Sequence, residues 1–317
     1  MDVFIVVPTV FNVPSVVLHQ QIMDWAMYEQ TQQVASIVIV GGEPIALAQK
    51  KGFVQMSEAA AIPLLANSKE AKILHFGYRL KGADKWPQYF IPLYDPNEDT
   101  SLGFLKKWKA KQAYKKFVKQ ATQTIYVHEG APLSTLPTYD WSMLAATKDQ
   151  LTEGHPYFLA FLSADELVHV LKEFSIFKKW QQTNMCIVLV MQNQEQLTKA
   201  AQVIKSYKFK EAVILVEMAN CTLAWMAAAY LSIWSNCLLY HSYMMKWSAF
   251  WEVPLLINEQ QTRLPLAWHQ AGEIFDFSEK MGLSNHFKLY YKDEVYRQSR
   301  AQMGIAWLTT INSTFVS

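Results

Sequence analysis

The sequence has few of the residues that mark several common kinds of site. Only three of its 317 residues are cysteines, Cys186, Cys221 and Cys237, and they show no metal-ligand spacing. Three thiols cannot all pair with one another, so we expect reduced cysteines in a cytoplasmic setting rather than a disulfide framework. Basic and acidic residues nearly balance, 29 against 27, which excludes nucleic-acid binding by bulk charge.

Glycine is also scarce, with 11 in the chain and none between the first predicted strand, 3–7, and the helix predicted from residue 15. Dinucleotide and P-loop sites need glycines there, because backbone N–H groups must approach the phosphates closely. The pair Gly41-Gly42, after the second predicted strand, is interpreted as a turn. No Gly-x-Ser-x-Gly elbow of a serine hydrolase occurs either.

The eight histidines are scattered and include no HxxxH or HExxH pair, so we predict no metal ion and no cofactor. His75 and His128 lie at the ends of predicted strands, where ligand sites form in open α/β sheets. The alternative is that each is an ordinary histidine at a sheet edge whose hydrogen bonds are satisfied.

What the sequence does have is an alternation of apolar strand-length runs and helical stretches, with 51% apolar residues overall. The runs are continuous rather than alternating, which is typical of strands covered on both faces, and the alternation with helices favours parallel sheets. The predicted strands are 3–7, 37–40, 73–76, 89–93, 125–127, 157–162, 186–191, 213–216 and 255–257. The predicted helices are 15–30, 104–121, 165–180, 194–207 and 293–308.

The stretch 130–156 carries Pro132, Pro137, Gly154 and Pro156 and separates two sets of strands. The sequence therefore predicts an α/β protein with two domains, an N-terminal one over 1–140 and a C-terminal one over 141–292. The C-terminal helix, 293–317, is a candidate addition to the first domain.

Residues 218–245 contain no charge, and 15 of the 19 residues in 222–240 are apolar, long enough to span a bilayer. Ser232, Ser235 and Asn236 interrupt this run, and the α/β pattern continues on both sides of it. The interpretation we favour is a buried helix over 221–231, a Ser-Asn turn, and a strand over 237–240. The N-terminus enters a strand without a basic region, so no secretory signal is expected.

The helix predicted over 104–121 carries seven lysines between Lys106 and Lys119, with no acid between Asp99 and Glu129. A basic amphipathic helix of this kind can lie on anionic lipid, which would place the protein at the inner face of the membrane. The alternative, which we favour, is the solvated face of a helix packed on a sheet.

Several segments between Pro156 and Ile311 match one known family in their order along the chain and in their types of residue. The second half of the chain resembles the family 4 retaining glycosyltransferases of the GT-B fold. The matching pieces are a donor-domain first strand at 157–162, its helix at 171–180, the approach to the Pro-Ser donor loop at 228–236, the Val-Pro strand at 253–257, the stretch 264–276 and the C-terminal linking stretch 288–294. The resemblance implies two Rossmann-like domains facing across a cleft.

The departures from the family fall where its chemistry is expected. The two family glutamates, eight positions apart, correspond to Leu239 and Trp247 here, and the acceptor-domain His-Asp appears as Tyr94-Asp95. The Gly and basic residues that hold the donor diphosphate are also missing after the strand 157–162. The resemblance therefore implies a glycosyltransferase-like protein with a degenerate donor site.

Two functions follow from this resemblance. The first is sugar transfer from a nucleotide-sugar to a glycan or lipid-linked acceptor; the alternative is a non-catalytic protein that binds a glycan or a protein partner. Tryptophans crowd 234–268, where they serve an interface or fill an emptied cleft. The residues we would place in the cleft are the catalytic candidates Glu252 and Asp95, together with His128, Asn236, His241 and Asn258.

Overall fold

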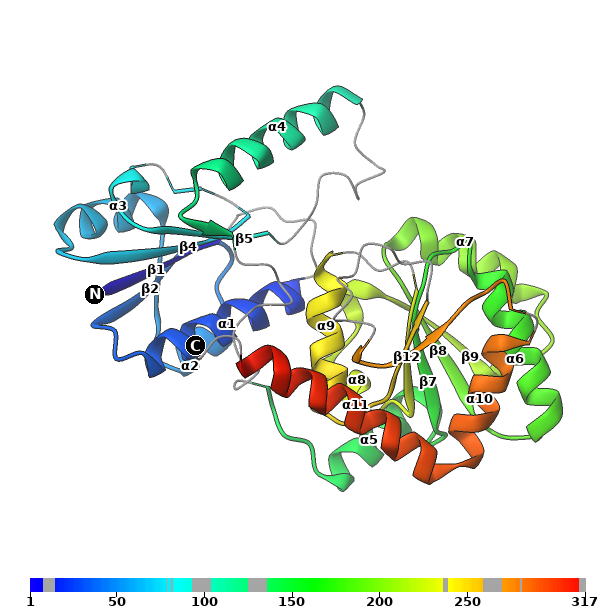
Figure 1. Cartoon of the computed structure of the whole chain (residues 1–317). Helices are drawn as coiled ribbons and strands as arrows, with labels where there is room; N and C mark the ends of the chain where they lie inside the picture. Colours follow the sequence, from blue (N-terminus) through cyan, green and yellow to red (C-terminus); the bar gives the residue numbers. More distant parts are fainter. Residues whose placement is uncertain are drawn as a thin grey trace. The chain divides into compact units, whose positions relative to one another are not determined.

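The structure is a computed structural model (Figure 1), and it describes residues 1–7, 15–77, 79–80, 82–92, 104–124, 136–235, 239–258, 270–279 and 281–313. The chain divides into two compact units. Unit 1 is Met1–Leu136 with Leu238–Tyr243, and unit 2 is Pro137–Cys237 with Met244–Ser317. Each unit contains one six-stranded parallel sheet flanked by helices, so the predicted fold class is confirmed.

Unit 1 is built on sheet A, whose strand order is β3-β2-β1-β4-β5-β6. The strands are β1 (Asp2–Val7), β2 (Ser36–Gly41), β3 (Val54–Met56), β4 (Ala71–Phe76), β5 (Gln88–Ile91) and β6 (Gln123–Thr124). The helices are α1 (Ser15–Thr31), α2 (Ala46–Lys50), α3 (Glu58–Asn67), the 3₁₀ turn η1 (Ala83–Lys85) and α4 (Phe104–Gln120). Helix α1 lies on one side of the sheet, with α3 and α4 on the other (Figure 1).

Unit 2 is built on sheet B, whose strand order is β12-β11-β10-β7-β8-β9. The strands are β7 (Tyr157–Phe161), β8 (Cys186–Met191), β9 (Val213–Glu217), β10 (Leu231–Trp234), β11 (Leu255–Asn258) and β12 (Glu273–Phe275). The helices are α5 (Trp141–Thr152), α6 (Leu167–Gln181), α7 (Gln194–Lys205), α8 (Leu223–Ala228), α9 (Leu239–Phe250), α10 (Gly282–Lys292) and α11 (Glu294–Ser313), with 3₁₀ turns η3 (Lys210–Ala212) and η4 (Met218–Asn220). The first residues of α9 belong to unit 1.

The core of unit 2 explains why its strands read as unbroken apolar runs. All residues of β7, β8, β10 and β11 are buried, because helices cover both faces of the sheet. Helices α6 and α10 lie together on one side, with α5 and α8 on the other (Figure 1). On the first side Phe158 of β7 stacks on Phe287 of α10, with ring centroids 4.7 Å apart, and Phe177 of α6 packs against both.

Several sequence-based element predictions differ from the structure, and the strand predicted at 125–127 lies outside the described residues. Helix α6 begins at Leu167 rather than 165, because Ser163 and Glu166 form a hydrogen-bonded turn before it. The stretch read as a linker contains α5, which Asp140 caps by accepting a hydrogen bond from the Met143 amide. The strand expected at 237–240 lies earlier, at Leu231–Trp234, and residues 239–240 begin α9.

The uncharged stretch 218–245 is divided into η4, α8, β10 and the start of α9. Both α8 and β10 are far shorter than the bilayer thickness requires. Within the described part of the chain, no helix is both long and apolar enough to cross a membrane.

Candidate functional site

The strand order of sheet B contains one point where the direction of the crossovers reverses. From β7 the chain moves outward to β8 and β9, and it later returns to β10 on the other side of β7. Ligands of open α/β sheets bind outside the carboxyl ends of the strands at such a point. The residues that follow β7 and β10 therefore define the first candidate site.

A hydrogen-bonded polar cluster lies at this carboxyl edge. The Glu166 carboxylate accepts hydrogen bonds from the Ser163 amide at 2.8 Å and from the Ser163 hydroxyl at 3.0 Å. It also accepts one from the hydroxyl of Ser235, which follows β10. The Asn258 side-chain amide, at the end of β11, donates to the Ser235 hydroxyl oxygen at 2.8 Å. The cluster thus connects the carboxyl ends of three adjacent strands.

The position of Glu166 determines what this edge can bind. It precedes the first turn of α6, where backbone N–H groups and the helix dipole attract anions. The Glu166 side chain caps no amide of α6, but its carboxylate, bound to the Ser163 amide, brings a negative charge to this helix end. A phosphate that approaches this helix end meets a negative charge, in agreement with the missing glycine and basic residues after the strand.

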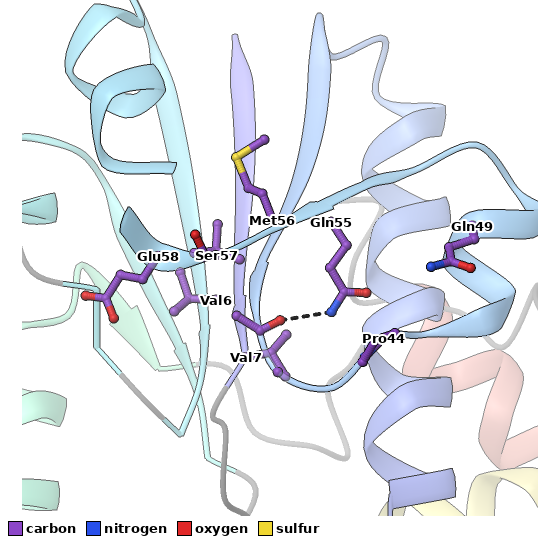
Figure 2. A pocket seen from close by; sticks show the side chains of 11 residues that line it. Val6, Val7, Pro44, Gln49, Gln55, Met56, Ser57 and Glu58 are labelled. Carbon is purple, nitrogen blue, oxygen red and sulfur yellow. Dashed lines mark hydrogen bonds between the residues drawn. The ribbon is translucent and has the colours of Figure 1, made fainter. Parts of the chain in front are cut away.

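Unit 1 has its own hollow at the carboxyl ends of β1, β2 and β3 (Figure 2), with a volume of about 520 Å³. Its polar wall is organised by Gln55 of β3. The Gln55 side-chain amide nitrogen donates to the carbonyl oxygens of Gly41 and Glu43, both at 2.9 Å, and its oxygen accepts from the Ile45 amide at 3.0 Å. One side chain therefore fixes the loop from β2 to α2.

The glycine pair predicted as a turn forms that loop and also lines the hollow. Gly41 has a φ of +80°, and a Cβ there would lie 2.8 Å from the Val7 carbonyl oxygen of the neighbouring strand. Only glycine allows this close approach of β2 to β1. Ser57 and Glu58, at the start of α3, complete the polar side of the hollow.

Of the predicted cleft residues that the structure describes in unit 2, Asn258 and Glu252 do not lie together. Asn258 belongs to the carboxyl-edge cluster of sheet B. Glu252 lies before the amino end of β11, exposed and with a φ of +58°, so it is at the opposite end of that strand from Asn258. Asp95, His128 and Asn236 lie outside the described residues.

The remaining predicted positions lie on α9. His241 is buried in unit 1, and this burial lowers the pKa of its imidazole to about 3, so the side chain is neutral at ordinary pH. Trp247, at one of the two family glutamate positions, is 1% exposed. Leu239, at the other, is the first residue of the helix. A tryptophan ring as deeply buried as that of Trp247 fills core volume rather than offering a surface.

His75 of β4 is fully buried, and its Nδ1 accepts a hydrogen bond from the Leu80 amide at 3.4 Å. Its ring packs edge-on against Phe117 of α4. In the parts of the chain that the structure describes, no three His, Cys, Asp or Glu side chains gather closely enough to hold a metal ion.

Sequence reasoning misses Glu166 as a site residue, together with Ser235 and Gln55. A signal for Glu166 is present, because Ser163-Ala164-Asp165-Glu166 has the Ser-x-x-Glu spacing of a capping box. Ser235 can be found from the strand before it once β10 is placed correctly. Nothing in the sequence around Gln55 distinguishes it from other glutamines.

No protein-family model and no curated protein matches the sequence. Solved structures do match the fold over almost the whole chain. The complex of Anabaena Alr3699/HepE with UDP and glucose is 10% identical, with a TM-score of 0.68, and the match covers 100% of this chain and 98% of that one. A glycosyltransferase from Rickettsia africae is 9% identical (TM-score 0.58, 98% and 93% covered), and a UDP-N-acetylglucosamine 2-epimerase is 9% identical (TM-score 0.55, 96% and 90% covered). The chain thus has the two-domain Rossmann-like architecture of GT-B glycosyltransferases and related UDP-sugar enzymes.

Proposed function

We propose that this chain binds a nucleotide-sugar and acts as a glycosyltransferase that transfers the sugar to a glycan or lipid-linked acceptor. The observation that carries the proposal is the fold match over the full chain to a protein solved with UDP and glucose. A shared fold does not by itself fix a reaction, so the nucleotide-binding step is tested first.

The donor nucleotide would bind at the carboxyl edge of sheet B, beside Ser163 and Asn258. Two arguments support this place: the crossover direction reverses there, and the buried hydrogen bond from Asn258 to Ser235 holds the edge in a fixed shape. Asp95 and His128 lie outside the described residues and stay candidates from the sequence alone. Glu252 is a poor choice as a displaced acid, because it lies at the other end of β11.

The donor site would be a degenerate form of the family 4 site. Both positions that correspond to the family glutamates, Leu239 and Trp247, lack an acid, and Trp247 is also buried. A second candidate, a non-catalytic protein that binds a glycan or a protein partner, rests on these replacements and on the Glu166 carboxylate at the start of α6.

The first test is thermal unfolding of the purified protein with UDP, GDP, ADP, CMP and dTDP and with their common sugars. A ligand that binds only the folded state raises the unfolding free energy by about 2.7 kcal/mol at a hundredfold excess over its Kd. We expect a shift with UDP or a UDP-sugar. No shift with any nucleotide would overturn the donor proposal and leave the non-catalytic candidate.

Two variants test the location of the nucleotide. Glu166→Gln removes a negative charge beside the proposed diphosphate position, so UDP should bind about tenfold more tightly. Asp165→Asn removes the same charge from an exposed neighbour and is the matched control, with little change expected. Equal UDP affinity in both variants would place the nucleotide elsewhere.

The chemical step is then followed with a bound UDP-sugar. Transfer or hydrolysis gives a net release of UDP, whereas epimerisation gives a nucleotide-sugar whose sugar is altered. Chromatography of the nucleotide products separates these outcomes. Binding without any change in the nucleotide-sugar, with a panel of glycan and lipid-linked acceptors present, would support the non-catalytic candidate.

We also propose that the solvent face of α4 rests on an anionic membrane surface, which would place the protein at the cytoplasmic side. Phe117 is turned inward against Phe90 of β5, whereas Trp108 on the opposite side of the helix is 54% exposed. Lys115 and Lys119 follow Trp108 at intervals of seven and eleven residues, so they share its face, and both are exposed. Lysines attract anionic headgroups and tryptophan favours the interface.

Sedimentation with vesicles tests this contact. The protein should bind vesicles that contain phosphatidylserine and not those of phosphatidylcholine alone. Trp108→Ala and the double variant Lys115→Gln/Lys119→Gln should weaken binding, whereas Lys50→Gln/Lys51→Gln, which removes two exposed lysines at the end of α2, should not. Equal binding of all variants would remove α4 from the proposal.

A further inference from the structure

Unit 2 contains a second hollow, of about 700 Å³, at the amino ends of β10 and β11. The side chains that form its floor are small and apolar. They include Ala229, just before β10, and Val253, just before β11. The walls come from α5, α11 and the loop between α9 and β11. This hollow is at the opposite end of the strands from the carboxyl-edge cluster, so it is separate from the proposed nucleotide site.

Two tryptophans give the hollow flat apolar surfaces. Trp141, in the first turn of α5, is 77% exposed. Tryptophan side chains are on average highly buried in folded proteins, so this exposure is unusual. Trp251 is held in place, because its indole Nε1 donates to the Pro137 carbonyl oxygen at 3.1 Å and Tyr139 packs edge-on against its ring. One ring is thus exposed to solvent and the other is fixed in the wall.

The two cations of the hollow differ in their partners. Arg297 of α11 is bound to Glu294 through two hydrogen bonds, of 2.5 and 2.8 Å. Lys148 of α5 is half-buried, with its Nζ 5.4 Å from the centre of the Trp141 ring, and it forms no ion pair with any residue that the structure describes. Burial and the positive charge of Arg297 both lower the pKa of Lys148. A ligand anion would offset both effects.

We propose that this hollow binds an acidic saccharide, with a sugar ring against Trp141 or Trp251 and the acid group on Lys148. The C–H faces of a sugar ring are apolar and flat enough to lie against an indole, while its hydroxyls need polar partners. Gln298 and Gln302 of α11 supply planar amides on the wall, and Glu252 supplies a carboxylate. This inference does not depend on the proposed transferase activity.

The structure offers a matched control for the key pair. Trp180, at the end of α6, is 44% exposed, and Lys288 of α10 lies over its ring at 5.6 Å. This pair has the same chemistry as Trp141 and Lys148 but does not line the hollow. Variants of the two pairs therefore separate binding in the hollow from general effects of an exposed tryptophan beside a lysine.

The experiment is calorimetric titration of the full chain with trigalacturonate and with the same trisaccharide after reduction of its carboxyl groups. We expect trigalacturonate to bind more tightly than the neutral form. Trp141→Ala and Lys148→Gln should weaken trigalacturonate binding by about tenfold. Trp180→Ala and Lys288→Gln should leave it unchanged. Because Trp141 is exposed, its variant should fold, and the unfolding temperature confirms this before the titration.

Three results would overturn the proposal. The first is the absence of trigalacturonate binding at millimolar concentration, and the second is equal affinity for the acidic and neutral trisaccharides. The third is equal weakening by the variants of the Trp141 pair and of the Trp180 pair. If the trisaccharides do not bind and a co-purified protein instead covers Trp141 and shields it from solvent, the hollow is a protein interface. Failure of this titration leaves the nucleotide measurements unaffected, since those concern the other end of sheet B.

Discussion

The Asn258 side-chain amide donates a 2.8 Å hydrogen bond to the Ser235 hydroxyl oxygen, between the ends of two adjacent parallel strands. Ser235 in turn donates to Glu166, which lies just before α6. Both Ser235 and Asn258 are buried, at 1% and 3% exposure. A single hydroxyl thus connects β10 and β11 to the start of the helix that follows β7, and it sets the shape of the carboxyl edge.

Ser235→Ala tests the importance of this connection. The variant removes an acceptor from Asn258 and a donor from a carboxylate, so we expect the free energy of unfolding to fall by about 1–3 kcal/mol. Urea denaturation measures it. Ser278→Ala, which removes an exposed hydroxyl that bonds Asp276, should change stability by less than about 0.5 kcal/mol. If the two variants are equally stable, the carboxyl-edge cluster is not a structural unit.

Gln55 is the corresponding organiser of the unit 1 hollow (Figure 2). Gln55→Ala removes three hydrogen bonds to the loop from Gly41 to Ile45, so a loss of about 1–3 kcal/mol is expected. Amide hydrogen exchange of Ile45 should also become faster, because its acceptor is gone. Gln49→Ala is the control, since this exposed glutamine lines the same hollow and its side chain forms no hydrogen bond with another residue that the structure describes. Unchanged exchange at Ile45 would argue against the role of Gln55.

The sequence is most informative where strands are fully buried. The predicted strand 186–191 coincides with β8, since six buried apolar residues in a row allow no other placement. It is least informative where short elements depend on their neighbours. β3 and β12 have three residues each, and β12 exists because β11 pairs with it. Such pairing is a tertiary effect that no local pattern contains.

The candidate site is only partly predictable for a related reason. Asn258 is a candidate because it follows a predicted strand, and the structure places it in the cluster at the carboxyl edge. Glu252 is a candidate because of its charge near the family's glutamate positions, but it precedes β11 and so lies at the other end of the strand from Asn258. The predicted strand 255–257 agrees with β11 and already places Glu252 before it, so this candidate rests on its distance from the family's glutamate positions and not on which end of the strand carries the site.

Glu273 of β12 gives the protein an acid-dependent contribution to stability. Burial alone would raise its pKa, but the His286 imidazole 3.5 Å away and a hydrogen bond from Tyr296 outweigh it and lower the pKa to about 2, from an ordinary value of 4.5. The stabilisation is therefore complete above pH 4.5 and is lost as the pH falls toward 2. In Glu273→Gln, the decline of stability over this range should be shallower. The exposed Glu211→Gln should retain the wild-type decline, and a steeper decline in Glu273→Gln would contradict the assignment.

His241 makes stability depend on pH over a higher range than Glu273 does. Its pKa falls from 6.5 to about 3 because burial disfavours the imidazolium, so the unfolded chain binds a proton that the folded chain does not. Stability should therefore decrease as the pH falls from about 6.5 toward 3. His241→Phe removes this titration and should flatten that part of the curve, whereas His169→Gln, at an exposed position of α6, is the control. Parallel curves for His241→Phe and the wild type would show that the imidazole is charged when folded.

Alanine substitutions at Gly41 and Gly52 distinguish the stability cost of a left-handed backbone from the cost of a steric contact. They have nearly the same φ, +80° and +79°, but a Cβ on Gly41 would lie 2.8 Å from the Val7 carbonyl oxygen, whereas no atom of the described residues lies within 4 Å of one on Gly52. Gly52→Ala should thus cost only the left-handed conformation, about 1–2 kcal/mol. Gly41→Ala should cost more than this, because the oxygen belongs to the backbone of β1 and cannot turn away. Urea denaturation of the two variants gives the difference directly. Equal losses would mean that β1 and β2 can separate at this point, and the hollow beside them would then be less rigid than its hydrogen bonds indicate.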